Sequence, residues 1–147
     1  MGADREEAGV NVSAQQLFAA LPGEWRFSRV ITGQGTASGL ARFQPAGADE
    51  LHYREDGTLT LDAGYTGPAY REYRYRLDGE ALQVCFPDGR IMHTLRPDAE
   101  AATHLCGADV YTGHYRLADP DTFHISYEVA GPHKDFTIAT VFRRVTG

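Results

Sequence analysis

From Gly23 onward, apolar and polar residues alternate with a period of two, which is the pattern of β-strands with one buried face. The dipeptide Asp-Gly occurs three times within this pattern, at 56–57, 78–79 and 88–89, each time between alternating runs. Asp-Gly is a strong signal for a tight hairpin turn, because both residues tolerate positive φ angles. No segment between the runs is long enough for a crossover helix, so strands that are neighbours in sequence should run antiparallel.

An open sheet of this many strands would leave two long edges exposed, and closure into a barrel removes them. The sequence therefore predicts an all-β fold, a single antiparallel up-and-down barrel of about ten strands. A β-sandwich is the alternative. The two short runs on either side of Gly107 are either two strands or one bent strand. The expected strands lie near 23–32, 36–44, 50–55, 58–64, 69–77, 81–86, 90–96, 102–107, 109–117, 122–130 and 135–145.

One short helix is expected before the first strand. Ser13 begins the sequence Ser-Ala-Gln-Gln, in which Gln16 completes a capping box. Val12 and Leu17 are placed for a hydrophobic staple, and Pro22 ends the pattern. We therefore predict a helix over 13–21.

Length and charge limit the classes of protein to which this chain can belong. The 147 residues suffice for one domain, which we expect to comprise a flexible N-terminus, 1–11, and a barrel, 12–147. A net charge of −6 without a basic run argues against nucleic acid as a partner. No apolar run approaches the ~20 residues of a membrane span, and the N-terminus lacks a signal peptide's apolar core. We expect a cytoplasmic monomer or homodimer that binds no membrane.

Motifs for cofactors and covalent catalysis are missing from the sequence. Cys85 and Cys106 match neither a disulfide framework nor a zinc spacing. There is no glycine-rich phosphate loop, dinucleotide fingerprint or Gly-X-Ser-X-Gly motif. We therefore expect no metal and no cofactor.

Alternation also assigns side chains to the two faces of each strand. Arg29 and Arg71 fall on the faces that carry the apolar residues of their strands. An unpaired buried charge costs several kcal/mol, so these groups must pair, contact water or contact a ligand. Small barrels can enclose one small molecule. Either a ligand cavity results, or Arg29 and Asp109 form a buried structural pair within a packed core. The predicted ligand-binding residues are Trp25, Arg29, Arg71, Tyr73, Tyr75 and Tyr127.

The segment HLCGADVYTGHY, residues 104–115, concentrates ionisable and aromatic side chains. A histidine beside Asp109, either His93 or His104, would titrate near neutral pH and could transfer protons. The interior arginines would hold an anionic oxygen of the substrate. The predicted catalytic residues are His93, His104, Asp109 and Tyr111.

These residues favour one function and leave alternatives open. We predict binding of a small organic molecule, aromatic or acidic, inside the barrel, with histidine-assisted proton transfer as an additional role. A cofactor-free cyclase, isomerase or dehydratase is one alternative, because enclosure and proton transfer suffice for such reactions. A metal- or haem-binding barrel is another, with His93, His104 and Cys106 as candidate ligands. A protein interaction module that uses the outer sheet surface is the last.

The segment LPGEWRFSRVI resembles the lipocalin and calycin barrels, which carry Gly-X-Trp on their first strand. Gly23 and Trp25 match that motif. The resemblance implies that the helix at 13–21 closes one end of the barrel. It also implies that Arg143 or Arg144, from the last strand, packs across the tryptophan.

A closer resemblance covers residues 22–144. The segments GEWRFSRVI, AYREYRY, DGRIMHTL, HLCGADVYTGHY and GPHKDFTIATVFRR look like a family of short lipocalin-like proteins known as a domain of unknown function. That resemblance implies the barrel fold and no particular reaction. The haem-binding nitrobindins are more distantly similar, and their glycine-rich first-strand pattern is replaced here by RFSRVI.

Overall fold

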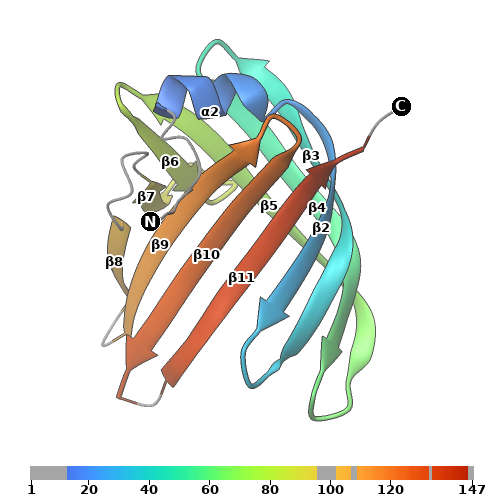
Figure 1. Ribbon diagram of the computed structural model, residues 1–147. Coiled ribbons are helices and arrows are strands. Elements are labelled where there is room, and N and C mark those ends of the chain that lie inside the picture. Colours follow the sequence, from blue (N-terminus) through green and yellow to red (C-terminus); the bar gives the residue numbers. More distant parts are fainter. Residues whose placement is uncertain (1–12, 96–101, 107–108, 133, 146–147) are drawn as a thin grey trace, which may run out of the picture.

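The computed structural model describes residues 13–95, 102–106, 109–132 and 134–145 (Figure 1). The N-terminus expected over 1–11 lies outside the described residues. The strands form one antiparallel sheet of ten, in the order β7-β6-β5-β4-β3-β2-β11-β10-β9-β8. The strands are β2 (Gly23–Ile31), β3 (Gly35–Gly47), β4 (Glu50–Leu61), β5 (Thr66–Asp78), β6 (Ala81–Cys85), β7 (Ile91–Leu95), β8 (Ala102–Cys106), β9 (Asp109–Asp119), β10 (Thr122–Gly131) and β11 (Lys134–Arg144).

The sheet curls around a shared interior (Figure 1). The first strand, β2, pairs with the last strand, β11, which joins the two halves of the chain. At the ends of the strand order, β7 and β8 lie against each other, although no hydrogen-bonded ladder joins them among the described residues. The predicted antiparallel up-and-down barrel is confirmed, with a seam between β7 and β8 at which the strands are in contact without pairing.

The predicted helix is α2 (Ala14–Ala20), which lies across one end of the barrel (Figure 1). Ser13 caps it with the full capping box, because its side chain accepts from Gln16 N while the Gln16 side chain accepts from Ser13 N. Leu17 is fully buried against the barrel core. The amide of Gln15 donates to Gly79 O at 2.6 Å, which ties the helix to the β5–β6 turn.

Arg144 connects the last strand to this plug. Its guanidinium lies 4.2 Å from the centroid of the Trp25 ring and donates to Ala20 O at 2.6 Å and Pro22 O at 3.1 Å. The indole Nε1 of Trp25 donates to Leu21 O at 2.8 Å. Of the two candidate arginines, Arg144 therefore has the position that the calycin resemblance implies.

Two of the three predicted Asp-Gly turns are confirmed. Gly79 (φ 59°) lies between β5 and β6, and Gly89 (φ 95°) lies between β6 and β7. Both φ values favour glycine, because a Cβ atom would be strained there. Of the two alternatives on either side of Gly107, the single bent strand is wrong: β8 and β9 are separate strands, with Cys106 opposite Asp109.

The predicted turn at 56–57 is wrong, because β4 runs without interruption from Glu50 to Leu61. Gly57 stands directly opposite Gly39 of β3. A Cβ atom on Gly57 would collide with the backbone oxygen of Ser38 and approach Phe27 Cζ to 3.0 Å. The glycine therefore allows two strands to approach closely, and it does not form a turn.

Aromatic rings fill the part of the interior beneath α2. Phe43 contacts Tyr75 and Tyr53 at centroid distances of 5.1 and 4.7 Å, and Trp25 contacts Phe123 at 6.3 Å. Such pairs add to the stabilisation from apolar burial. The inward side chains of β2 change from apolar to charged as the strand leaves the helix. They are, in order, Trp25, Phe27 and Arg29.

Candidate functional site

A buried ion pair lies beyond the aromatic layer. Arg29 of β2 and Glu55 of β4 are 5% and 4% exposed, respectively. Arg29 Nη1 donates to Glu55 Oε2 at 2.6 Å, and Nη2 donates to Oε1 at 2.8 Å. Arg29 Nε donates to Thr140 Oγ1 of β11 at 2.8 Å. Bidentate pairs of this kind are among the stronger hydrogen-bonded contacts. Together with the hydrogen bond to Thr140, the pair connects three strands, β2, β4 and β11.

The charged state of this pair follows from its contacts. Burial alone would raise the pKa of Glu55, but the hydrogen bonds and charge of Arg29 outweigh burial and hold that pKa below its usual value. Burial would lower the pKa of Arg29, and Glu55 raises it above its usual value instead. The Tyr53 hydroxyl also donates to Glu55, and burial together with the Glu55 charge raises the pKa of Tyr53. Glu55 is therefore ionised, and Tyr53 is a neutral donor.

A second arginine approaches the same carboxylate from β5. Arg71 stands opposite Glu55 in the strand register, and its Nε lies 3.9 Å from Glu55 Oε2. Its side chain is 41% exposed, whereas that of Glu55 is 5% exposed. This long ion pair is the only polar contact of Arg71 within the described part of the chain. Two guanidiniums, Arg29 and Arg71, thus share one carboxylate, and these three described side chains together carry a net charge of +1.

A cavity of about 50 Å³ lies against these groups. This volume holds a few ordered waters and is well below the roughly 300 Å³ at which drug-sized ligand pockets begin. The described part of the interior therefore has less free volume than the predicted ligand cavity would need. Aromatic rings occupy the space beneath α2. The described lining residues are Arg29, Tyr53, Glu55, Arg71, Tyr73, Tyr75, Val84, Met92, Ile125, Tyr127, Ile138, Thr140 and Phe142.

Tyrosines form much of the cavity wall. Tyr53 and Tyr73 are stacked, with ring centroids 6.1 Å apart and planes 13° apart. Burial is the main cause that raises the pKa of both Tyr75 and Tyr127 above the usual value. Their hydroxyls consequently stay protonated near neutral pH and offer apolar rings with polar tips.

The predicted ligand-binding residues divide into two groups. Five of them line this one cavity: Arg29, Arg71, Tyr73, Tyr75 and Tyr127. Trp25 is fully buried beneath α2 with Arg144 and is not among the cavity's described lining residues. Arg29 takes Glu55 as its partner. The structural alternative expected Asp109 in this role, and the side chain of Asp109 lies outside the described part of the structure.

The predicted catalytic residues lie on β7, β8 and β9, and their side chains fall outside the described part of the structure. The backbone register places His93 opposite Val84 and His104 opposite Tyr111. Asp109 stands opposite Cys106 at the end of the β8–β9 pair. Their roles in proton transfer or metal binding stay predictions.

Sequence reasoning missed Glu55, Tyr53 and Thr140. Alternation from Leu51 would have placed Tyr53 and Glu55 on the inner face. The strand expected over 50–55 includes Glu55 as its last residue, next to the turn expected at 56–57, and its inner face was not assigned. The contacts of Thr140 depend on the pairing of β11 with β2, which local patterns do not reveal.

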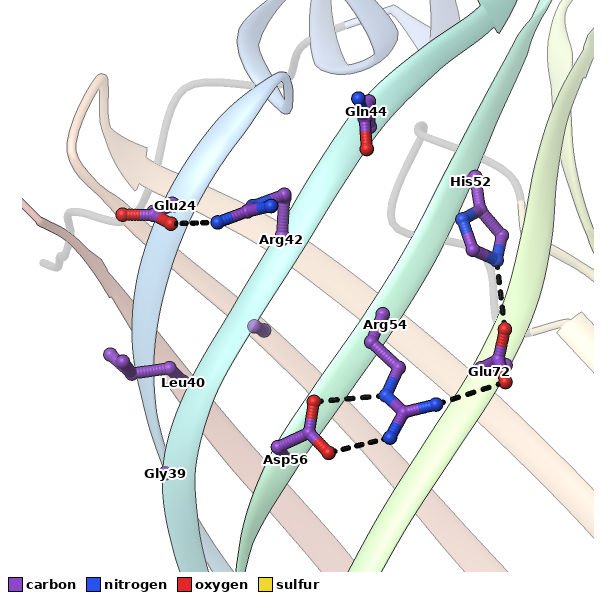
Figure 2. A pocket seen from close by; sticks show the side chains of 10 residues that line it. Glu24, Gly39, Leu40, Arg42, Gln44, His52, Arg54, Asp56 and Glu72 are labelled. Atoms are coloured by element: carbon purple, nitrogen blue, oxygen red, sulfur yellow. Dashed lines mark hydrogen bonds and ion pairs between the residues drawn. The ribbon is translucent and has the colours of Figure 1, made fainter.

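A hollow of about 630 Å³ lies on the outer face of β2 to β5 (Figure 2). Figure 2 shows that its charged side chains are occupied with one another. Arg54 pairs with Asp56 at 2.7 Å and with Glu72 at 3.0 Å, and Glu72 also contacts His52 at 3.0 Å. This surface is therefore a network in which each of the charged side chains already has a partner.

Two features are absent from the described residues. No group of three His, Cys, Asp or Glu side chains among them could hold a metal ion. No helix in this part of the chain is long and apolar enough to cross a membrane.

Together, the curled antiparallel sheet, the plug helix with its arginine–tryptophan contact and the ionisable interior define a calycin-like β-barrel. The chain belongs to the family of unknown function DUF6314, which it matches over residues 21–144. No protein of curated function matches the sequence.

Solved structures with the same fold include natural and designed barrels. The S-type phycobiliprotein lyase CPES from Guillardia theta is 13% identical with a TM-score of 0.65, and the match covers 92% of this chain and 94% of that one. A redesigned barrel, mFAP1, bound to DFHBI, is 16% identical with a TM-score of 0.51, covering 86% and 96%. A fluorescence-activating β-barrel designed de novo is 16% identical with a TM-score of 0.51, covering 87% and 96%. At these identities the likeness shows the fold alone.

Proposed function

We propose that the barrel interior binds a small aromatic acid whose anionic group pairs with Arg71. The observation that carries this proposal is the unequal use of two interior arginines. Arg29 is neutralised by two short hydrogen bonds to Glu55, whereas Arg71 has, among the described residues, a single ion pair of 3.9 Å. The excess positive charge next to a buried carboxylate favours an anionic ligand.

The geometry of Arg71 favours a carboxylate in particular. A guanidinium presents two parallel N–H donors to a carboxylate, and such bidentate contacts are stronger than neutral hydrogen bonds. Arg71 is half-exposed and lines the cavity, so its side chain can meet an incoming anion without first breaking a short hydrogen bond.

The rest of the cavity favours a planar, apolar body on the ligand. Tyr73, Tyr127 and Met92 line it, and aromatic and thioether side chains pack well against a ring. The cavity of about 50 Å³ is smaller than a benzene ring requires, so binding needs the displacement of water and a turn of Arg71. Ligands of one ring fit this proposal better than large ones.

The structural neighbours support ligand binding in a barrel of this kind, and they support no particular reaction. A barrel of this shape is known bound to the small molecule DFHBI, and another neighbour is a phycobiliprotein lyase. Proton transfer by His93 or His104 would add a reaction to binding, and this role is a prediction from the sequence only.

Calorimetric titration with benzoate and with benzamide tests the proposal, because the two have similar size and only benzoate is charged. We expect saturable benzoate binding that is at least tenfold tighter than benzamide binding. Native mass spectrometry of freshly purified protein should also reveal a retained organic acid. Equal affinity for the two compounds, or no saturable binding of either, would contradict the proposal.

A further inference from the structure

Arginines on the outer face of the barrel are of two kinds. Most of those near β2 have a carboxylate partner at hydrogen-bonding distance. Arg26 of β2 and Arg143 of β11 have none, and neither makes a hydrogen bond or ion pair in the described part of the chain. The paired arginines are Arg42 with Glu24, Arg54 with Asp56 and Arg144 with Asp121.

Arg26 and Arg143 stand directly opposite each other in the register of β2 and β11. Both side chains are exposed and lie on the outer face, since Trp25 and Phe142, their sequence neighbours, are buried inside. Like charges directly opposite each other across two strands are destabilising. In a protein with a net charge of −6, an unneutralised pair of this kind is a local exception.

A surface hollow of about 380 Å³ lies over this pair. Two hydroxyl side chains, Ser28 and Ser38, line it together with both arginines. Phe27 and Gly39 complete its described wall, and because the Phe27 side chain is buried inside the barrel, only its backbone faces outward. None of these lining residues is a carboxylate. The hollow thus combines two hydroxyl donors with two cations that have no carboxylate partner among the described residues.

From these observations we infer that the hollow between Arg26 and Arg143 binds the phosphoryl group of a small phosphomonoester. Each guanidinium offers parallel N–H donors that match phosphate oxygens, and the serine hydroxyls add further donors. A phosphomonoester carries a charge of about −1.5 to −2 at neutral pH, which balances two cations, whereas a carboxylate would balance one. The volume exceeds that of a bare phosphate and leaves room for an attached organic group.

The groups around the hollow are consistent with this assignment. Two carboxylates near the ends of β2 and β11, Glu24 and Asp121, pair with other arginines, Arg42 and Arg144. On the β10 side, burial lowers the pKa of His124, and the charges of Arg116 and Arg143 lower it further, with Asp119 acting in the opposite direction. The positive field of Arg143 therefore extends beyond the hollow.

This site is separate from the interior one. Arg29 points into the barrel, and Arg26 and Ser28 point out of the same strand, β2. Binding, or its absence, at one site therefore does not decide whether the other site binds a ligand.

Calorimetry with phenyl phosphate and with inorganic phosphate, at constant ionic strength, tests the inference in the full chain. We expect phenyl phosphate to bind saturably and more tightly than inorganic phosphate. Arg26→Gln and Arg143→Gln should each weaken binding about tenfold or more, while Arg42→Gln, which removes a paired charge from the same face, should change it less than twofold. Without ligand, Arg26→Gln should not lower the Tm, because it removes a like-charge contact.

Nitrogen-15 NMR of the arginine side chains gives an independent readout on the unmodified protein. The Nε–H signals of Arg26 and Arg143 should shift during the phenyl phosphate titration, and that of Arg42 should not. The inference is overturned if Arg42→Gln weakens binding as much as Arg26→Gln, or if phenyl phosphate binds no more tightly than inorganic phosphate. It is also overturned if phenyl phosphate does not shift the Nε–H signals of Arg26 and Arg143.

Discussion

The guanidinium of Arg29 and the carboxylate of Glu55 form a doubly hydrogen-bonded ion pair inside the barrel, with N–O distances of 2.6 and 2.8 Å. Arg71 contacts the same carboxylate at 3.9 Å from the more exposed side. The two arginines that alternation assigns to the interior therefore have different roles. Arg29 is held by the buried ion pair, and Arg71 is the residue that we propose binds the ligand.

Removal of the Glu55 charge should destabilise the barrel strongly. Glu55→Gln leaves Arg29 buried without a counter-charge, and breaking such a pair typically costs about 3–5 kcal/mol. Urea unfolding measures the change in the free energy of unfolding. Asp56→Asn is the matched control, since Asp56 follows in sequence, faces outward and pairs with exposed Arg54. An equal decrease in the free energy of unfolding for both variants would show that the interior ion pair stabilises the fold no more than the exposed one.

The same pair predicts a dependence of stability on pH. Because the folded-state pKa of Glu55 is lowered, its contribution to stability is present above the unfolded-state value and is lost as pH falls through the folded-state value. The free energy of unfolding should therefore fall more steeply below about pH 4 in the wild type than in Glu55→Gln. Asp56 and Asp88 also have lowered pKa values, and their contribution is common to both proteins. Parallel pH curves for the two proteins would refute this prediction.

Arg144 should be needed to hold the plug helix in place. Arg144→Ala removes donors to Ala20 O and Pro22 O and the contact with the Trp25 ring. We expect a loss of about 2–4 kcal/mol, from charged hydrogen bonds and the cation–π contact together. Thermal unfolding and the fluorescence of Trp25 report the change. Arg143→Ala, the neighbouring substitution on the outer face, should leave both nearly unchanged.

Sequence periodicity predicted the parts of the fold that depend on local contacts. The capping box at Ser13, the inward faces of the strands and the turns at Gly79 and Gly89 all follow from short-range rules. The error at Gly57 arose because the same dipeptide suits a turn and a close approach of two strands. Only the position of Gly39 on the neighbouring strand distinguishes the two cases.

The contacts within the candidate site could be predicted less well from the sequence. Alternation placed Arg29 and Arg71 inside, but their different roles depend on where Glu55 stands in the register. Arg29 comes from β2 and Glu55 from β4, and β3 separates these strands in the sheet. The curvature that brings the two side chains together is a property of the whole barrel, so no local pattern predicts their contact.

The availability of Arg71 is tested most directly by titrating benzoate into the wild type, Arg71→Gln and Arg74→Gln. Arg74 is a close control: it lies on the same strand, its side chain is 42% exposed, and it also has a carboxylate at 3.9 Å, but it faces outward. We predict that Arg74→Gln keeps the wild-type Kd, whereas Arg71→Gln weakens binding about 10- to 100-fold with little change in Tm. Undiminished benzoate binding by Arg71→Gln, or its failure to fold, would contradict the assignment of Arg71 to the ligand.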